Sequence, residues 1–263
     1  MSRIKEAFAR GKAFIPFITC GDPDLETTGK IVRAMQENGA DLIELGIPFS
    51  DPTAEGPVIM EADRRAIEGG ATTDKIFDFV CTLRKDVTVP LVFMTYANVV
   101  YSYGIGKFAA HCAESGIDGL ILPDVPFEEK EEFAPAFRSR GLDFISMVAP
   151  TSNDRVARIA RQAEGFLYIV SSLGVTGVRG EISTDVGAIV RHARENTDVP
   201  CAVGFGISAP EQAANMAAVS DGVIVGSAIV RLAAQYGRNA APEIGAYVQS
   251  MSAAVKNQQS AVF

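Results

Sequence analysis

Eight short runs of β-branched, aromatic and other apolar residues recur along the chain, and stretches with helix-like spacing separate them. Each run is almost continuously apolar instead of alternating, which is typical of parallel strands that are covered on both faces. The pattern therefore predicts eight buried strands: AFIPFIT (13–19), DLIELGI (41–47), PLVFMTY (90–96), GLILPDV (119–125), DFISMVA (143–149), FLYIVSS (166–172), PCAVGFG (200–206) and GVIVGSA (222–228).

The segments between these runs predict helices. Residues 25–39 (LETTGKIVRAMQENG) end on Gly39, a residue type that commonly stops a helix. Residues 209–219 (APEQAANMAAV) place Pro210 at a helix start. The first residues of the chain are amphipathic, and they predict an extra N-terminal helix before the first strand.

Eight strand–helix units in succession predict an α/β fold, a single (β/α)8 TIM barrel domain over residues 1–263. An open, doubly wound sheet is the alternative, and a G-x-G-x-x-G motif after its first strand would mark a nucleotide site. That turn reads TCGDPD instead. The connections 48–60 and 173–186 are longer than a barrel requires, and long loops at a barrel's catalytic end tend to be functional.

Composition narrows the class of protein. The 263 residues are 48% hydrophobic and carry a formal net charge of −8 with scattered basic residues, so a nucleic-acid partner is not expected. No signal peptide and no long apolar span is evident, and we expect a cytoplasmic protein. The cysteines are far apart in the sequence, which predicts buried thiols in a reducing compartment instead of disulfides or zinc ligands. They are Cys20, Cys81, Cys112 and Cys201.

Glu44 lies in the middle of the second apolar run. It alternates with Leu42 and Gly46, so it is predicted to point into the barrel, while Ile43 and Leu45 point toward the helices. A buried carboxyl without a partner has a raised pKa, which suits a general acid–base. The alternative is a structural glutamate that is hydrogen-bonded to loop backbone.

The loop after this run contains two further carboxylates, Asp51 and Glu55. Carboxylates in surface loops are ordinarily only solvated. However, the pairs Asp51-Pro52 and Gly56-Pro57 restrict the backbone and indicate a shaped loop. This favours Glu55 as a second functional carboxylate.

The last two strands end in GFGIS (204–208) and GSAIV (226–230), each followed by a helix start. Glycine lets an anion approach the backbone, and a helix N-terminus supplies free N–H groups, so these turns predict a phosphate site. Tight turns without a ligand are the alternative. The loop LGVTGVRGE (173–181) has the composition of a lid that closes over substrate, with simple disorder as its alternative.

The chain lacks the residues that some reaction types need. No lysine stands near the carboxyl end of a predicted strand, where a Schiff-base aldolase would require one, and the nearest is Lys107 in a helical segment. The two histidines, His111 and His192, also fall in helical segments, so no metal site is expected. With a Schiff base and a metal site excluded, the sequence predicts carboxylate acid–base chemistry on a small phosphorylated molecule.

The run IELGIPFSDPTAEGPVI (43–59) resembles the signature of the tryptophan synthase alpha subunit family. Further matching motifs follow in the same order over essentially the whole chain: FIPFITCGDP at the first strand, MTYANVVYSYG at the third, SSLGVTGVRG after the sixth, and GFGIS and GSAIV at the end. The resemblance implies a (β/α)8 barrel that cleaves indole-3-glycerol phosphate to indole and glyceraldehyde 3-phosphate.

The resemblance also implies residue roles. Glu44 matches the glutamate that transfers the proton, and Glu55 matches the carboxylate that accepts a hydrogen bond from the indole N–H. Substrate-binding roles are implied around the indole, in the lid and at the phosphate for Phe17, Tyr96, Tyr168, Thr176, Gly177, Phe205, Gly206, Gly226 and Ser227. The family pattern has Asp at position 55 and Leu at position 53, where this chain has Glu55 and Thr53.

The family works with a beta subunit that carries pyridoxal phosphate, so the resemblance implies an α2β2 tetramer and no cofactor in this chain itself. The loops that would meet the beta subunit contain Pro48, Asp51, Asn98 and Pro126. Three alternatives remain open: a stand-alone lyase, another phosphate-binding barrel enzyme, and a non-catalytic allosteric partner of the beta subunit.

Overall fold

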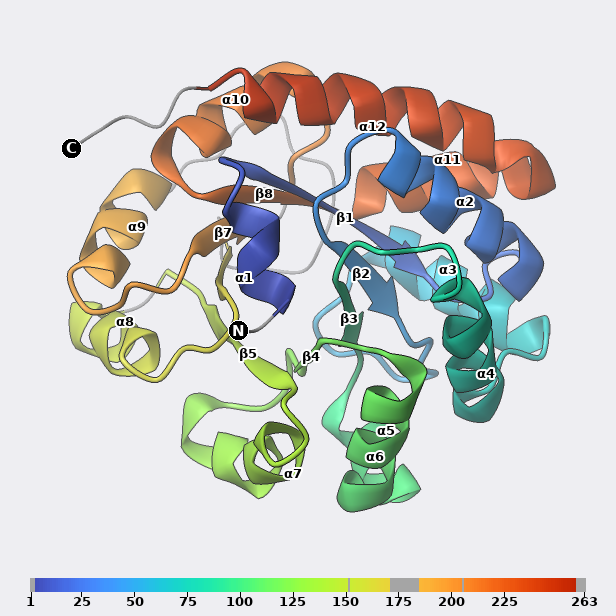
Figure 1. The fold of residues 1–263 in the computed structure, drawn as a ribbon, viewed down its shortest axis with the longest axis horizontal. Coiled ribbons are helices and arrows are strands. Elements are labelled where there is room, and N and C mark those ends of the chain that lie inside the picture. Colours follow the sequence, from blue (N-terminus) through green and yellow to red (C-terminus); the bar gives the residue numbers. More distant parts are fainter. Residues whose placement is uncertain (1–2, 151, 171–184, 205, 259–263) are drawn as a thin grey trace.

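A computed structural model describes residues 3–150, 152–170, 185–204 and 206–258. Its eight parallel strands follow one another around a closed barrel, and β8 pairs with β1 (Figure 1). The predicted (β/α)8 barrel is thereby confirmed, and the open-sheet alternative is wrong. The strands are β1 (Ala13–Thr19), β2 (Ile43–Gly46), β3 (Leu91–Met94), β4 (Gly119–Ile121), β5 (Asp143–Val148), β6 (Leu167–Val170), β7 (Cys201–Gly204) and β8 (Gly222–Val225).

Helices surround the barrel (Figure 1). They are α1 (Arg3–Phe8), α2 (Leu25–Glu37), α3 (Pro57–Glu68), α4 (Thr73–Leu83), α5 (Ala97–Tyr103), α6 (Ile105–Ser115), α7 (Ala134–Arg138), α8 (Asn153–Ala160), α9 (Val186–Arg194), α10 (Pro210–Val219), α11 (Ser227–Tyr236) and α12 (Ala240–Lys256), with 3-10 turns η1 (Phe127–Glu132) and η2 (Gly237–Asn239). As predicted, α2 stops before Gly39, which has a φ of 101°, and Pro210 is the first residue of α10.

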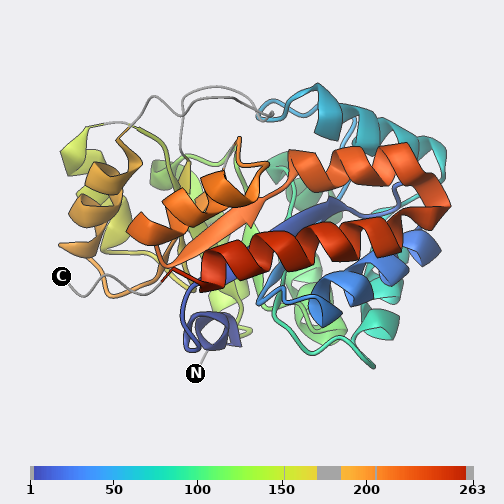
Figure 2. The same cartoon turned by 90° about the horizontal axis from the view of Figure 1, so that it is seen from above.

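Helix α1 lies across one mouth of the barrel (Figures 1 and 2). Its side chains Ile4 and Ala7 join the cluster of residues that fills the barrel interior. The Phe8 ring packs on Phe166, just before β6, with 5.9 Å between the ring centroids. Because α1 closes the mouth at the amino ends of the strands, a ligand has to enter from the carboxyl ends, where barrel active sites lie.

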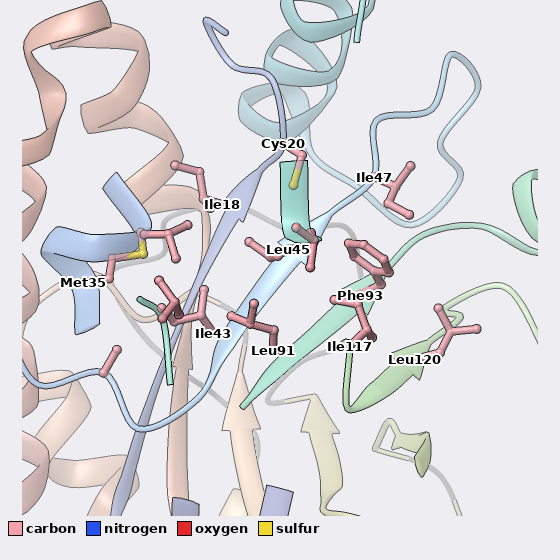
Figure 3. Close-up of a cluster of buried hydrophobic side chains, with 14 of the residues drawn as sticks. Ile18, Cys20, Met35, Ile43, Leu45, Ile47, Leu91, Phe93, Ile117 and Leu120 are labelled. Atoms are coloured by element: carbon pink, nitrogen blue, oxygen red, sulfur yellow. The ribbon is translucent and has the colours of Figure 1, made fainter. Parts of the chain in front are cut away.

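The strand residues alternate between two apolar layers. Ile43 and Leu45 of β2 point outward and pack with Phe93 of β3 in the layer between the barrel and its helices (Figure 3). Leu42 belongs to the interior cluster with Ile15, so Glu44, two residues further on, shares that inward side. The predicted orientation of Glu44 is confirmed.

Three predicted details need correction or cannot be followed. Helix α3 begins at Pro57, so the end of the predicted 48–60 loop is helical, because the Gly56-Pro57 pair forms a helix start. The connection 173–186 lies outside the described residues except for its last two positions, at the start of α9. Cys81 is exposed on α4, while Cys20, Cys112 and Cys201 are buried as predicted.

A membrane-crossing helix was not expected. Among the described residues, no helix is long and apolar enough to cross a bilayer.

Candidate active site

A cavity of about 790 Å³ opens at the carboxyl ends of the strands. Residues of β1, β2, β3, β5, β6 and β8 line it together with the loops that follow β2, β4 and β7. Among the predicted site residues in its wall are Phe17, Glu44, Glu55, Tyr168, Gly206, Gly226 and Ser227. Residues that are far apart in the sequence therefore meet in one place, at the end of the barrel predicted for catalysis.

Glu44 stands in the cavity wall between Phe17 of β1 and Val92 of β3, its partners in the strand register. The residue is only 1% exposed, and its Oε1 has no hydrogen-bond partner among the described residues. Burial raises the pKa of Glu44 to about 8, because the charged form loses its water shell. At neutral pH Glu44 is therefore a carboxylic acid with a proton to donate.

Tyr168 of β6 lies near Glu44. Burial and the charge of Glu44 both raise the pKa of the Tyr168 hydroxyl well above its ordinary value. The ring fits because the neighbouring strand carries Gly204, where a Cβ would lie 2.5 Å from the Tyr168 hydroxyl oxygen. The phenol therefore stays neutral beside Glu44, and glycine at 204 leaves the space that it fills.

Phe17 provides an aromatic surface beside Glu44. Its ring lies close to two glycines, Gly46 of β2 and Gly226 after β8: a Cβ at Gly46 would be 2.6 Å from the ring and one at Gly226 would be 3.4 Å away. Glycine at 46 thus makes room for the ring within the cavity wall. A flat apolar ligand would find aromatic faces here at Phe17 and Tyr168.

Glu55 lines the cavity from the loop between β2 and α3. Its carboxyl group is hydrogen-bonded to the side chains of Asp63 and Tyr96, while its Oε2 is buried and has no partner among the described residues. Burial raises the pKa of Glu55, and the two hydrogen bonds act in the opposite direction. One carboxyl oxygen thus has unused capacity to accept a hydrogen bond.

Tyr96 lies behind this loop and is not part of the cavity wall. Its ring packs on Phe49, with centroids 5.3 Å apart, and its hydroxyl accepts a hydrogen bond from the Ala54 N–H at 3.1 Å. Since the same hydroxyl is bonded to Glu55, Tyr96 supports the loop carboxylate and does not line the cavity itself.

Asp63 was not predicted from the sequence, although it is buried and hydrogen-bonded to Glu55. It is 4% exposed, and its Oδ2 accepts a hydrogen bond from the Phe49 N–H at 3.4 Å. Burial and the neighbouring charge of Glu55 raise the pKa of Asp63 to about 8. The sequence held a signal: Asp63 falls on the apolar stripe of α3 with Ile59, Ala62 and Ala66.

The N-terminus of α11 forms part of the cavity wall. Gly226 precedes the helix, Ser227 is its first residue, and both line the cavity. The first N–H groups of a helix have no partner within it, and the helix dipole favours an anion there. Gly206, with a φ of 78°, lines the same wall. This end is suited to a phosphate.

Of the two predicted Gly/Ser turns, the serine of the turn after β7 contributes less than the serine of the turn after β8. The Ser208 N–H and hydroxyl both bond to Oε1 of Gln212, at 2.9 and 3.3 Å. The Gln212 side chain therefore caps the start of α10, and the Ser208 groups are engaged within the protein. Thr176, Gly177 and Phe205, which the resemblance placed in the lid and at the phosphate, lie outside the described residues.

Two polar residues of the cavity wall were not predicted. The Ser146 hydroxyl on β5 is buried without a partner among the described residues. Lys130 of η1 also lines the cavity, contrary to the prediction that Lys107 was the nearest lysine. Its Nζ donates to the Gln162 carbonyl at 3.1 Å and lies 5.1 Å from the centre of the Phe127 ring. This engaged amine is not presented as a free nucleophile.

The residues predicted to meet a partner surround the mouth. Asp51, Asn98 and Pro126 are exposed and Pro48 is partly exposed, on the loops after β2 and β4 and on α5. Tyr101, on the same helix as Asn98, is 69% exposed, the largest value among the exposed large apolar side chains of the described residues. No group of three or more metal-ligating side chains is found within the described residues.

Comparisons with known proteins agree with the motifs. The family model for the tryptophan synthase alpha chain matches residues 4–260. The tryptophan synthase alpha chain of Lacticaseibacillus casei is 46% identical over 255 residues, which are 97% of this chain and 96% of that one. The crystal structure of the alpha chain from Legionella pneumophila is 36% identical, with a TM-score of 0.87 and 98% of each chain covered.

A structure of the tryptophan synthase complex from Pyrococcus furiosus is also similar to this chain. It is 34% identical, with a TM-score of 0.84, and the match covers 92% of this chain and 98% of that one.

Proposed function

The chain belongs to the tryptophan synthase alpha chain family, a family of lyase subunits in tryptophan biosynthesis, and we propose that it cleaves indole-3-glycerol phosphate to indole and glyceraldehyde 3-phosphate. The observation that carries this proposal is Glu44: a buried, protonated carboxylic acid in the wall of a cavity that is also lined by the N-terminus of a helix, α11. An acid and an anion site in one cavity suit an acid-catalysed reaction of a phosphate ester.

The substrate would lie with its phosphate at Gly206, Gly226 and Ser227 and its indole ring between the aromatic surfaces of Phe17 and Tyr168. In this orientation the bond between the ring and the glycerol chain passes Glu44. The indole N–H points to Glu55, whose Oε2 has no partner among the described residues. Thr176, Gly177 and Phe205 are proposed to complete the lid and the phosphate site.

The reaction needs two proton movements. Glu44 first donates its proton to C3 of the indole, which leaves a cationic indolenine, and the Glu55 carboxylate stabilises this cation through the ring N–H. The Glu44 carboxylate then takes the proton of the hydroxyl on the adjacent side-chain carbon. The carbon–carbon bond breaks, its electron pair returns to the ring as indole, and the hydroxyl carbon becomes the aldehyde of glyceraldehyde 3-phosphate.

This scheme explains the burial of Glu44. A general acid is most effective when its pKa lies near the working pH, and a positioned acid–base contributes roughly 10²- to 10⁴-fold to a rate. The pKa of about 8 at Glu44 leaves the group protonated at pH 7 and still able to release its proton to carbon. The chain's own chemistry is therefore proposed to require neither a metal nor an organic cofactor.

We also propose that the chain works with a beta subunit in an α2β2 assembly in the cytoplasm. The similarity to the Pyrococcus furiosus tryptophan synthase complex supports a partner of this kind. The partner would hold the pyridoxal phosphate and would dock on the loops with Pro48, Asp51, Asn98 and Pro126 at the cavity mouth. Docking there would close the mouth over the substrate and raise the lyase rate.

The proposal is tested by measuring indole release from indole-3-glycerol phosphate by the purified chain, alone and with a cognate beta subunit. We expect release by the chain alone and a faster rate with the partner. High activity that is unchanged by the partner would identify a stand-alone lyase. No release in either condition, with substrate still bound, would identify a non-catalytic allosteric subunit. No binding at all would point to another phosphate-binding barrel enzyme.

A further inference from the structure

We propose that Asp63 is a positioning residue of the active site, which shares one proton with Glu55 and thereby holds the Glu55 carboxylate in place for the indole N–H. This inference rests on the proposed lyase function, and it assigns a role to a residue that lies outside the motifs of the substrate-binding loops. The contacts of four residues carry it: Asp63, Glu55, Tyr96 and Phe49.

Asp63 contacts the loop between β2 and α3 at two separate points. Its Oδ2 accepts the Phe49 N–H at 3.4 Å near the start of the loop, and its carboxyl group is hydrogen-bonded to Glu55 near the end. Tyr96 holds the same segment from the other side, since its hydroxyl accepts the Ala54 N–H at 3.1 Å and bonds Glu55. The catalytic carboxyl is thus supported by two buried side chains, one on α3 and one in the turn between β3 and α5.

Two carboxyl groups in hydrogen-bonding contact have to hold a proton between them, because two adjacent buried anions repel each other. Asp63 is 4% exposed and Glu55 is partly exposed and lines the cavity. The more buried group loses more hydration when it is charged. The proton therefore resides on Asp63, which donates it to Glu55, and the negative charge remains on the side chain that faces the ligand.

The other groups around Asp63 do not compete for this proton. Burial and Asp63 raise the pKa of the Cys20 thiol, and burial and Glu55 raise the pKa of the Tyr96 hydroxyl, so both stay neutral. The buried Thr19 hydroxyl lies beside Asp63 and does not titrate in this range. The loss of the proton shared by Glu55 and Asp63 is therefore not coupled to the titration of Cys20, Tyr96 or Thr19.

The arrangement also explains how the chain can use a glutamate at position 55. A longer side chain has one more rotatable bond and would spread its carboxylate over several positions. Bonds from Asp63 and Tyr96 restrict it to one of them, which preserves the alignment on which rate depends. Glu55, with its longer side chain, is therefore held in position by a second buried carboxyl group, that of Asp63.

The test compares Asp63→Asn and Asp63→Ala with Glu61→Gln, an exposed carboxylate on the same helix that serves as the control. Asparagine keeps an N–H donor for Glu55 and an oxygen for the Phe49 N–H, whereas alanine removes both. We expect Asp63→Ala to lower kcat/KM by about 10- to 100-fold, mainly through kcat. Asp63→Asn should recover most of this loss, and Glu61→Gln should behave as the wild type.

The pH profile separates positioning through a shared proton from simple packing. In the wild type, kcat/KM should fall at alkaline pH with two ionisations, those of Glu44 and of the carboxyl pair. In Asp63→Asn only the ionisation of Glu44 remains, so the alkaline limb becomes less steep. An unchanged limb in Asp63→Asn, or wild-type kcat/KM in folded Asp63→Ala, would overturn the proposal.

A second measurement does not depend on turnover. Carboxyl carbons labelled with ¹³C should show that Asp63 and Glu55 titrate together in the wild type, and that Glu55 titrates in a single independent step in Asp63→Asn. Independent titration in the wild type overturns the shared proton. If the wild type released no indole but Asp63 and Glu55 titrated together, the proposed lyase function would be wrong and the proposed shared proton would be supported.

Discussion

The hydroxyl of Tyr96 accepts a hydrogen bond from the Ala54 N–H at 3.1 Å, and so joins the turn between β3 and α5 to the loop that carries Glu55. Tyr96→Phe keeps the ring packed on Phe49 and removes only this oxygen. We expect kcat/KM to fall about tenfold, because Glu55 loses a donor, and the free energy of unfolding to fall by about 1 kcal/mol. Kinetics and denaturant unfolding measure the two effects.

The matched control for this variant is Tyr236→Phe, at the exposed C-terminal end of α11. Its hydroxyl is far from the loop in the sequence and has no place in the proposed mechanism. It should change neither quantity. If Tyr96→Phe matched this control in kcat/KM, the hydroxyl would have no part in placing Glu55.

Glu44→Gln keeps the shape of the side chain and removes its transferable proton. We expect kcat for indole release to fall by about 10²- to 10⁴-fold, while the affinity for indole-3-glycerol phosphate, measured by calorimetry, changes little. Glu61→Gln again supplies a surface control. Turnover near the wild-type rate in Glu44→Gln would show that Glu44 does not transfer the proton.

The same residue makes stability depend on pH. The pKa of Glu44 is raised from 4.5 to about 8 in the folded chain, because burial disfavours the charge. Below pH 4.5 the group is neutral in both states. Between pH 4.5 and 8 only the unfolded chain releases the proton, so the free energy of unfolding declines by up to about 1.4 kcal/mol per pH unit. Above pH 8 this contribution is fully lost.

Glu44→Gln removes that decline. At pH 9 the variant should be more stable than the wild type by on the order of several kcal/mol, and at pH 4 the two should be alike. Urea unfolding at pH 4, 7 and 9 measures the difference. A gap of the same size at every pH would show that glutamine changes the packing and not the ionisation.

Glu55→Gln and Glu55→Asp separate the charge from the position of the carboxylate. Glutamine cannot stabilise a cationic intermediate through its charge, and we expect a fall in kcat/KM of about 100-fold. Aspartate keeps the charge but draws it back by about 1 Å from Asp63 and Tyr96, which should cost about 10- to 100-fold. Steady-state kinetics of both variants decides the assignment: unchanged turnover in Glu55→Gln contradicts it.

The fold could be predicted from the sequence because apolar runs report burial, and all eight runs contain a strand. The predicted strands extend too far at their carboxyl ends, however. The run 90–96 continues to Tyr96, but β3 ends at Met94. Tyr96 is the residue before α5. It is buried against Phe49, so it has apolar surroundings although it does not belong to the sheet. Periodicity detects burial and does not detect the hydrogen-bond ladder.

The site was predictable to the extent that a strand determines the direction of a side chain. Glu44 could be placed in the barrel because alternation along β2 fixes its side. Asp63 could not be paired with Glu55 in the same way, because their contact depends on how the loop folds back over α3. Lys130 reaches the cavity from η1, well beyond the end of β4, for a similar reason.

Gly46 supplies the last prediction, since it sets the space for Phe17 beside Glu44. A Cβ at Gly46 would lie 2.6 and 2.9 Å from two carbons of the Phe17 ring, which therefore has to move. The ring is 4% exposed between β2 and the start of α11, and it can move mainly toward the cavity. Gly46→Ala should raise KM for indole-3-glycerol phosphate by about tenfold or more and destabilise the fold by about 1–3 kcal/mol.

Gly106→Ala is the matched control, because a Cβ at this helical position would meet no atom within 4 Å apart from the neighbouring backbone of its own helix. Alanine also favours a helix over glycine, so Gly106→Ala should be slightly more stable than the wild type and equally active. The pair of variants is compared by thermal unfolding and by KM. A Gly46→Ala chain with wild-type KM would mean that Phe17 yields without entering the substrate's space, and that its ring does not form the surface on which the indole binds.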